Sequence, residues 1–146
     1  MKFADIVAAA AKEKNFSRLV DAVPYAKFLG ITVDDRYGEL IATLAYNPRN
    51  IGNPILPAIH GGVIGALLET TAIFHLLWQR ESIQVPKIIT ITVDYLRSAG
   101  PVDTHAKGFI TKLGSRVANV RIEAWQTSPD KPVAMANANF LVTPAE

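Results

Sequence analysis

The chain of 146 residues contains no cysteine. Disulfide bonds, thiol nucleophiles and thiolate metal sites are therefore excluded, and so are the small secreted folds that disulfides stabilise. Histidine is scarce as well, and no two histidines have the spacing of metal ligands on one helical turn. We therefore expect no metal site. Considered without their neighbours, the three histidines have ordinary structural roles. We expect a capping or packing role for His60, a core or interface position for His75 and a solvated strand position for His105.

Neither sign of charge is in large excess. The chain has 15 Lys and Arg against 13 Asp and Glu, a formal net charge of +2, and no run of five like charges. Because nucleic-acid-binding proteins carry clustered basic residues, we expect no nucleic-acid partner. Hydrophobic residues make up 49% of the chain and charged residues 19%, which predicts one folded domain over residues 1–146 rather than a disordered chain.

The N-terminal segment contains a short apolar run. Residues 6–11 (IVAAAA) resemble the core of an export signal, but the run is too short and charged residues follow at once. Because apolar residues recur with helical spacing, residues 2–22 are predicted to form one or two amphipathic helices packed on the main body. We therefore divide the domain into a helical extension (1–23) and a core (24–144), and expect a cytoplasmic protein.

The rest of the chain alternates strand and turn patterns around one long helix. Pro24 ends the N-terminal segment, and Gly30 ends a short helical turn before the first strand. The predicted strands are 31–36, 39–46, 87–97, 102–113, 116–128 and 133–142, and the predicted helix is 60–80. Residues 47–59, with three prolines and three asparagines, are predicted to form a long loop, and such loops are often functional. Short connections favour an antiparallel sheet, so the predicted fold class is α+β.

The predicted helix is apolar nearly all round. Residues 61–78 (GGVIGALLETTAIFHLLW) are long enough to cross a membrane, but Glu69 lies at their centre. A central acid in lipid costs at least ~2.5 kcal/mol. We therefore expect no membrane span, but a helix that a strongly curved sheet covers on most sides. One side, with small residues in its N-terminal half, permits close approach by a ligand or another chain: Gly62, Gly65, Ala66, Glu69, Ile73 and Leu76.

Two glycines open this helix behind His60. A helix N-terminus leaves backbone N–H groups unpaired and carries a partial positive charge. Because glycines let a substrate oxygen approach the backbone, Gly61 and Gly62 are interpreted either as an oxyanion site or as simple turn geometry. Glu69 lies about two turns further along, on the side of Gly62. It could meet the same substrate only if the substrate lies along the helix, or if a symmetry partner supplies half of the pocket.

The run from His60 to Ala72 (HGGVIGALLETTA) resembles the signature of hotdog-fold acyl-CoA thioesterases, in particular of the phenylacetic-acid-degradation type. In that signature His-Gly-Gly opens the central helix and an acidic residue follows the histidine by nine positions, as Glu69 does. Many relatives carry Asp there, which is one methylene shorter. Residues 25–31 (YAKFLGI) and 93–97 (VDYLR) are similar to family segments before the first strand and after the helix. The resemblance implies a hotdog fold, a curved antiparallel sheet wrapped around a long central helix.

The same resemblance implies hydrolysis of an acyl-CoA thioester to a free acid and CoA. The Gly61 or Gly62 amide would polarise the thioester carbonyl, Glu69 would activate water or attack directly, and His60 and Asn53 would position substrate or water. The implied substrate- and CoA-binding residues are Thr90, Arg97, Lys112, Ser115 and Arg116. Two chains would pair into one continuous sheet with active sites at the interface, often with further pairing to a tetramer. No cofactor is expected, since CoA enters as part of the substrate.

Two other functions remain open. One is a non-catalytic acyl-CoA- or lipid-binding protein on the same fold. The other is an enoyl-CoA hydratase or dehydratase, because residues 54–57 (PILP) are similar to the proline-containing loop of hotdog hydroxyacyl dehydratases. Those enzymes have a histidine before the prolines, whereas His60 follows them and residues 47–52 contain no histidine. The hydratase is therefore the less favoured alternative.

Overall fold

The computed structural model describes residues 2–79 and 85–143. Three short helices come first: α1 (Phe3–Lys12), α2 (Phe16–Asp21) and α3 (Pro24–Leu29). Asn15 caps α2 by accepting a hydrogen bond from the Arg18 amide at 3.0 Å. Gly30 ends α3 with a φ of 78°, a left-handed conformation that glycine adopts without strain. The prediction of an N-terminal helical segment is thus confirmed.

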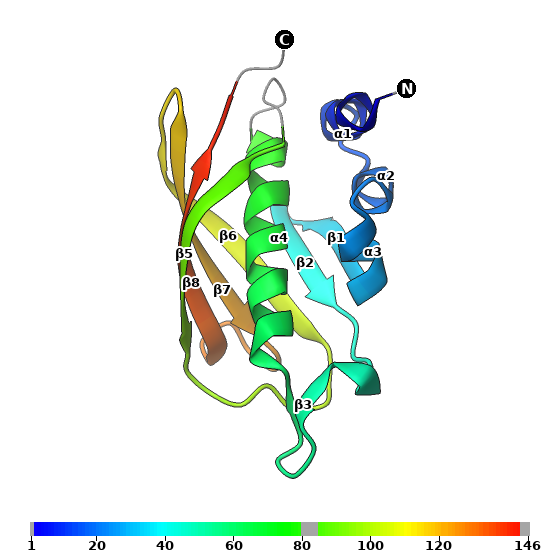
Figure 1. Cartoon of the computed structure of the whole chain (residues 1–146), viewed down its shortest axis with the longest axis vertical. Coiled ribbons are helices and arrows are strands. Elements are labelled where there is room, and N and C mark those ends of the chain that lie inside the picture. The colour runs from blue at the N-terminus through cyan, green and yellow to red at the C-terminus, as the bar shows by residue number, and fades with distance from the viewer. Residues whose placement is uncertain (1, 80–84, 144–146) are drawn as a thin grey trace.

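Six strands form one antiparallel sheet in the order β1-β2-β6-β7-β8-β5 (Figure 1). They are β1 (Ile31–Arg36), β2 (Glu39–Leu44), β5 (Lys87–Tyr95), β6 (Thr104–Leu113), β7 (Val117–Trp125) and β8 (Pro132–Leu141). β1 and β2 join through a tight turn at Tyr37 and Gly38, both with positive φ. The α+β prediction is confirmed. The sheet order departs from the chain order because β6 pairs with β2, and β5 pairs with β8 at the edge.

The long helix α4 (Gly61–Gln79) lies across the concave face of this sheet (Figure 1). It has the length and composition of a membrane-crossing helix, yet half of its most apolar window is buried inside the protein. Leu67, Leu68 and Phe74 are fully buried. They belong to the same hydrophobic core as the inward-facing residues of β7, which alternate along the strand as the sequence predicts: Ala118, Val120, Ile122 and Ala124.

The predicted side of α4 that carries small residues is only partly open. Gly62 is exposed, and Gly65, Ala66 and Glu69 are half-buried, as expected. Leu76 differs, because it is completely buried within the hydrophobic core. Helical periodicity places Leu76 on the same side as Gly62, but it cannot anticipate that neighbouring elements cover that side near the C-terminal end of α4.

The predicted loop over residues 47–59 is more ordered than its composition suggests. It contains a 3-10 turn, η1 (Pro48–Asn50), and a two-stranded antiparallel sheet of β3 (Ile51–Asn53) and β4 (Ala58–Ile59). This hairpin extends beyond the N-terminal end of α4 (Figure 1). The loop prediction was wrong for these strands, since strands of two or three residues are too short to show a period in the sequence.

The N-terminal helical segment contacts the C-terminal end of α4 through Lys14 and Phe16. The Lys14 Nζ donates a hydrogen bond to the Trp78 carbonyl at 2.8 Å and lies 3.8 Å from the centre of the Trp78 ring. Phe16 packs on the same ring, with 5.0 Å between ring centres. The opposite, N-terminal end of α4 is left for the hairpin and for the end of β5.

Candidate functional site

The hairpin of β3 and β4 delivers His60 to the start of α4. The His60 amide donates a hydrogen bond to the Asn50 carbonyl at 2.8 Å, which extends the hairpin pairing up to the helix. Gly52 lies directly opposite, because a Cβ there would come within 2.7 Å of the His60 Cα. A larger residue at position 52 would therefore force the two strands apart. The position of His60 is set by backbone packing rather than by its side chain.

The backbone groups at the start of α4 differ in whether they have a hydrogen-bond partner. The Gly62 amide donates to the His60 Nδ1 at 2.9 Å, so His60 caps the helix, which is one of the two roles predicted for it. The His60 carbonyl accepts from the amides of Val63 and Ile64 at 3.0 and 3.2 Å. The Gly61 amide donates no hydrogen bond to any residue in the described ranges. Of the two glycine amides expected to polarise a carbonyl, only the Gly61 amide is therefore available.

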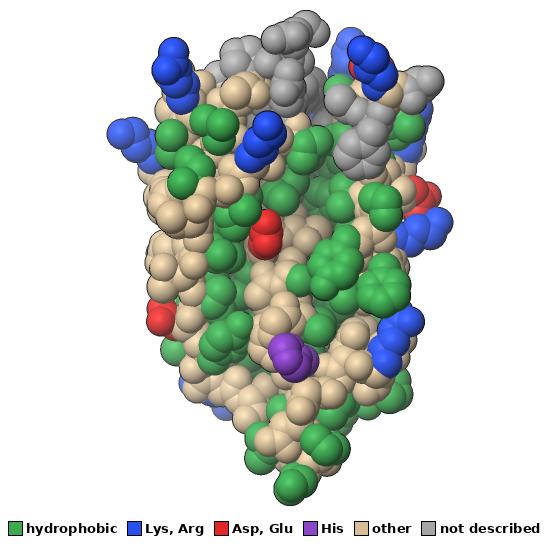
Figure 2. All heavy atoms as spheres, viewed as in Figure 1, with side chains coloured by type: hydrophobic (Ala, Val, Ile, Leu, Met, Phe, Trp, Pro, Cys, Tyr) green, Lys and Arg blue, Asp and Glu red, His purple; other side chains and the backbone are tan. Residues whose placement is uncertain are grey.

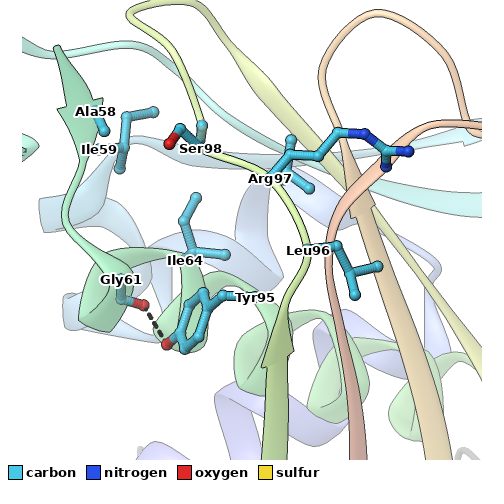
Figure 3. A pocket seen from close by; sticks show the side chains of 10 residues that line it. Ala58, Ile59, Gly61, Ile64, Tyr95, Leu96, Arg97 and Ser98 are labelled. Atoms are coloured by element: carbon cyan, nitrogen blue, oxygen red, sulfur yellow. Dashed lines mark hydrogen bonds between the residues drawn. The ribbon is translucent and has the colours of Figure 1, made fainter. Parts of the chain in front are cut away.

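Tyr95, the last residue of β5, lies over this first turn (Figure 3). Its hydroxyl donates to the Gly61 carbonyl at 2.7 Å. Both residues line a pocket of about 380 Å³ that also includes Ile64, Arg97 and Ser98, a volume within the range of small-molecule sites. In the sequence, Tyr95 belongs to residues 93–97 but carries no functional prediction of its own. Its position at the end of a strand, on the helix side of the sheet, indicates a role only because β5 lies beside Gly61 in the fold.

Glu69 is the only acidic residue of α4 and is half-buried. Within the described residues its carboxylate forms no hydrogen bond or ion pair. The surface over α4 is hollowed and lined mostly by hydrophobic side chains, and one acidic side chain lies inside the hollow (Figure 2). Glu69 does not line the pocket of Gly61 and Tyr95. Eight residues at 1.5 Å each put Glu69 about 12 Å along the helix from Gly61.

Two loop asparagines have different environments. Asn53, the one expected to help position substrate or water, is exposed, and its Oδ1 accepts hydrogen bonds from the amides of Ile55 and Leu56. Asn50 is only 8% exposed, and its buried Nδ2 has no partner in the described part of the chain. An unpaired buried donor is costly. Asn50, adjacent to His60, is therefore the asparagine whose side chain still requires a partner, a distinction that the sequence could not make.

The residues expected to contact CoA lie in separate places. The Arg97 guanidinium points away from Gly61 and donates to the Pro132 carbonyl at 2.6 Å (Figure 3). Thr90 does not line the pocket of Gly61. Its hydroxyl accepts a hydrogen bond from the Asn139 Nδ2 at 2.9 Å on the sheet face that points away from α4. Within one chain Thr90 is therefore not at the pocket of Gly61, because strand register decides which face a residue occupies. Its contact with substrate stays a prediction.

Lys112, Ser115 and Arg116 do come together. They line a second pocket of about 410 Å³ at the turn between β6 and β7. Sheet pairing aligns this turn with Lys87 at the start of β5, whereas Gly61 contacts Tyr95 at its end. The eight intervening steps of β5 correspond to about 26 Å. Within one chain, these three residues are therefore remote from the pocket at Gly61.

The other two histidines are less solvated than typical surface histidines. His75 packs against Gly108, and its buried Nδ1 has no partner among the described residues. Burial, and then the charge of Lys107, lower the pKa of His75. His105 lies in β6, as predicted, but it is half-buried and bonds to the Thr43 hydroxyl at 2.9 Å, so its side chain is only partly solvated. Burial is the main cause that lowers the pKa of His105.

Comparison with known proteins gives consistent results. Residues 56–133 match the family described as the thioesterase superfamily. The medium/long-chain acyl-CoA thioesterase YigI of Salmonella typhimurium is 28% identical over 135 residues, which cover 82% of this chain and 86% of that protein. The matched stretch contains the whole first turn of α4 and Glu69.

Solved structures extend the similarity to nearly the whole chain. The crystal structure of a Chromobacterium violaceum protein is 43% identical, with a TM-score of 0.76 over 99% of this chain and 98% of that one. A Bacillus halodurans protein, whose crystal structure was determined with CoA, is 19% identical with a TM-score of 0.72, covering 99% and 90% of the two chains. At that identity the second likeness concerns the fold alone.

Proposed function

Because the chain belongs to the thioesterase superfamily, we propose that it hydrolyses acyl-CoA thioesters to a free acid and CoA. The observation that carries this proposal is the Gly61 amide. It is a backbone donor at the positive end of a long helix, bordering a pocket and without a partner among the described residues. Such a donor suits the oxygen of a thioester carbonyl, on which negative charge develops during attack.

Glu69 supplies the second half of the chemistry. Its carboxylate either removes a proton from a water molecule that attacks the thioester carbon, or attacks that carbon directly. In the first route the tetrahedral intermediate places its negative oxygen at the Gly61 amide. The intermediate then breaks its C–S bond, and the CoA sulfur leaves as a thiol with the proton that Glu69 had taken. His60 caps the turn that presents the amide.

A single chain places these two groups too far apart for one carbonyl, since about 12 Å of helix separates them. We therefore propose that a second copy completes each site. β5 supports this arrangement. It is an edge of the sheet, it pairs with β8 alone among the strands of the described residues, and all nine of its residues are at least partly exposed. A long exposed edge strand is a template for pairing with another chain. Antiparallel pairing of two β5 strands would bring opposite ends of the two helices together.

The same pairing gives a role to the pocket of Lys112, Ser115 and Arg116. A twofold axis through β5 would put the partner's turn between β6 and β7 at the level of this chain's Tyr95, within reach of an extended CoA molecule. The two cations suit its phosphates, and the Ser115 hydroxyl can donate to them. The acyl group is proposed to be of medium or long chain length, the class for which the YigI relative is named. The apolar hollow over α4 is consistent with such a chain.

The primary experiment measures CoA release from thioesters ranging from acetyl-CoA to palmitoyl-CoA. Glu69→Gln keeps the shape of the side chain but removes the base, and we expect turnover to fall by about 10³-fold. Glu13→Gln, in an exposed ion pair of the N-terminal helices, is the matched control and should leave turnover unchanged. Near-normal hydrolysis by Glu69→Gln would exclude this mechanism. Tight acyl-CoA binding without turnover by the natural chain would favour the binding protein, and hydration of an enoyl-CoA would favour the hydratase.

The shared site is tested by complementation. Gly61→Pro removes the amide donor at the first helical position, where proline is tolerated, although its Cβ requires the Tyr95 ring to shift by a few tenths of an ångström. The variant should be inactive on its own. In a mixed dimer of Gly61→Pro and Glu69→Gln chains, one site has both natural groups and the other has neither. Refolding the two variants together should therefore restore activity toward half of the natural value per mixed dimer. Absence of any recovery, although mixed dimers form, would show that each chain carries a complete site.

A further inference from the structure

The peptide group between Gly61 and Gly62 is held at both of its polar atoms by side chains. Its carbonyl oxygen, on Gly61, accepts a hydrogen bond from the Tyr95 hydroxyl at 2.7 Å (Figure 3). Its N–H, on Gly62, donates to the His60 Nδ1 at 2.9 Å. The two side chains come from different elements, the end of β5 and the residue preceding α4. Rotation of this peptide would break both hydrogen bonds, so its plane is fixed.

The preceding peptide, between His60 and Gly61, is fixed from one end only. Its carbonyl accepts two helix amides, from Val63 and Ile64, whereas its N–H is the unpaired Gly61 donor. The Gly61 Cα joins the two peptide groups. The direction in which the Gly61 N–H points therefore depends on how firmly the following peptide is held, which includes the hydrogen bond from Tyr95.

Glycine makes this contact possible. A Cβ on Gly61 would lie 3.3 Å from two ring carbons of Tyr95, which is tighter than an ordinary contact, and one on Gly65 would lie 3.6 Å from the hydroxyl. The tyrosine ring thus occupies the space that a side chain at position 61 would fill, whereas a Cβ at position 65 would make an ordinary contact. Its register opposite Ala134 turns it toward the helix side of the sheet. Phenylalanine would fit the same space but could not hold the carbonyl.

We propose that Tyr95 is a positioning residue for the thioester hydrolysis proposed above, on which this inference rests. Its hydroxyl and the His60 ring together clamp the Gly61–Gly62 peptide, and the clamp aims the Gly61 N–H at the carbonyl oxygen before the substrate arrives. Donors that are oriented in advance stabilise the charge of the transition state without reorganising during the reaction. Tyr95 therefore serves the chemical step more than substrate binding.

The test compares Tyr95→Phe with Tyr37→Phe. Tyr37 lies fully exposed in the turn between β1 and β2, so its variant removes a hydroxyl that only water contacts. For Tyr95→Phe we expect kcat to fall about tenfold, less than the 10²–10³-fold typical of losing an oxyanion donor altogether, while KM stays within twofold. Thermal denaturation should show both variants folded with the natural midpoint. Tyr37→Phe should match the natural chain in every respect.

Two further measurements do not depend on turnover. The Kd of a non-hydrolysable S-alkyl-CoA thioether, which lacks the carbonyl, should be unchanged by Tyr95→Phe. In ¹H–¹⁵N spectra, the Gly61 and Gly62 amide signals should shift in Tyr95→Phe but not in Tyr37→Phe. Unchanged kcat, a loss confined to KM, or unshifted glycine signals would each overturn the role of Tyr95 while leaving the thioesterase function intact. Absence of acyl-CoA hydrolysis by the natural chain would instead overturn the function, and this role with it.

Discussion

The two halves of α4 differ in the contacts that they make, although they belong to one continuous helix. In the C-terminal half, Phe74, Leu76 and Leu77 are at most 1% exposed and belong to the hydrophobic core. In the N-terminal half, Gly62 is exposed and Gly61 and Gly65 are half-buried. The side of this half that faces the sheet is also in the core, since Ile64, Leu67 and Leu68 are at most 2% exposed. Both halves are thus held by burial of apolar area, and the first turn adds hydrogen bonds between side chains and its backbone.

Apolar packing and hydrogen bonding have different roles in α4: packing holds the helix on the sheet, and hydrogen bonds orient the backbone groups of its first turn. Apolar packing is non-directional and tolerates small displacements, so it anchors the helix to the sheet but does not orient any single backbone group. The hydrogen bonds of His60 and Tyr95 are directional and concern one peptide group. Substitutions of buried apolar residues such as those of the C-terminal half should therefore change stability, and substitutions in the first turn should change function with smaller effects on stability.

The largest effect on stability is expected for Phe74→Ala. Phe74 is completely buried, so its truncation leaves a cavity and should lower the free energy of unfolding by about 3–5 kcal/mol. Urea denaturation followed by circular dichroism measures the change. Gln79→Ala, at the exposed end of the same helix, should stay within about 0.5 kcal/mol of the natural chain. A similar small effect of Phe74→Ala would mean that this half of α4 is not the anchor.

An intermediate effect is expected for Gly62→Ala. A Cβ there would lie 3.0 Å from the Cε1 and Nδ1 of His60, so the ring must move and the cap is lost. The stability cost should be about 1 kcal/mol, with a larger proportional loss of kcat than the loss of stability explains. Gly100→Ala is the control, since its Cβ would find ordinary contact at 3.9 Å from Gln126. Equal kcat values for the two variants would contradict the separation of the two halves.

The smallest effect concerns pH. Because burial and Lys107 lower the pKa of His75, the unfolded chain takes up a proton below about pH 6.5 before the folded chain does. Stability should therefore fall as the pH drops through that value toward the lower pKa of the folded state. His75→Leu should reduce the slope of the free energy of unfolding against pH. The reduction should be smaller than ~1.4 kcal/mol per pH unit, the slope for uptake of one full proton. His105 should retain part of the slope, and an identical slope in His75→Leu would show that His75 does not contribute.

Much of the fold follows from local patterns in the sequence. The strand period placed β1 without error, and the strands after α4 within two residues for most of their ends. Proline and glycine marked the ends of the N-terminal helices and the start of α4. The hairpin of β3 and β4 was not predicted, because its strands are too short to show a period in the sequence. The burial of Leu76 was not predicted either, because it depends on neighbouring elements.

The candidate site divides in the same way. The motif at His60 and its spacing to Glu69 are local in the chain and could be recognised in the sequence. Tyr95 and Asn50 could not, because their importance comes from contacts across 34 and 10 positions. The face of the sheet on which Thr90 lies could not be predicted either, because the face that a strand residue occupies depends on sheet pairing.

By itself, the sequence determined the fold class, the central helix and the residue types available for chemistry, because periodicity, glycine and proline act over a few neighbouring positions. Only the tertiary structure decided which glycine amide stays unpaired among the described residues, which tyrosine bonds to the same turn, and that Glu69 lies outside the pocket of Gly61. The physical reason is the short range of hydrogen bonds and packing. Such contacts join residues that the chain separates, and only the folded sheet brings β5 beside the start of α4.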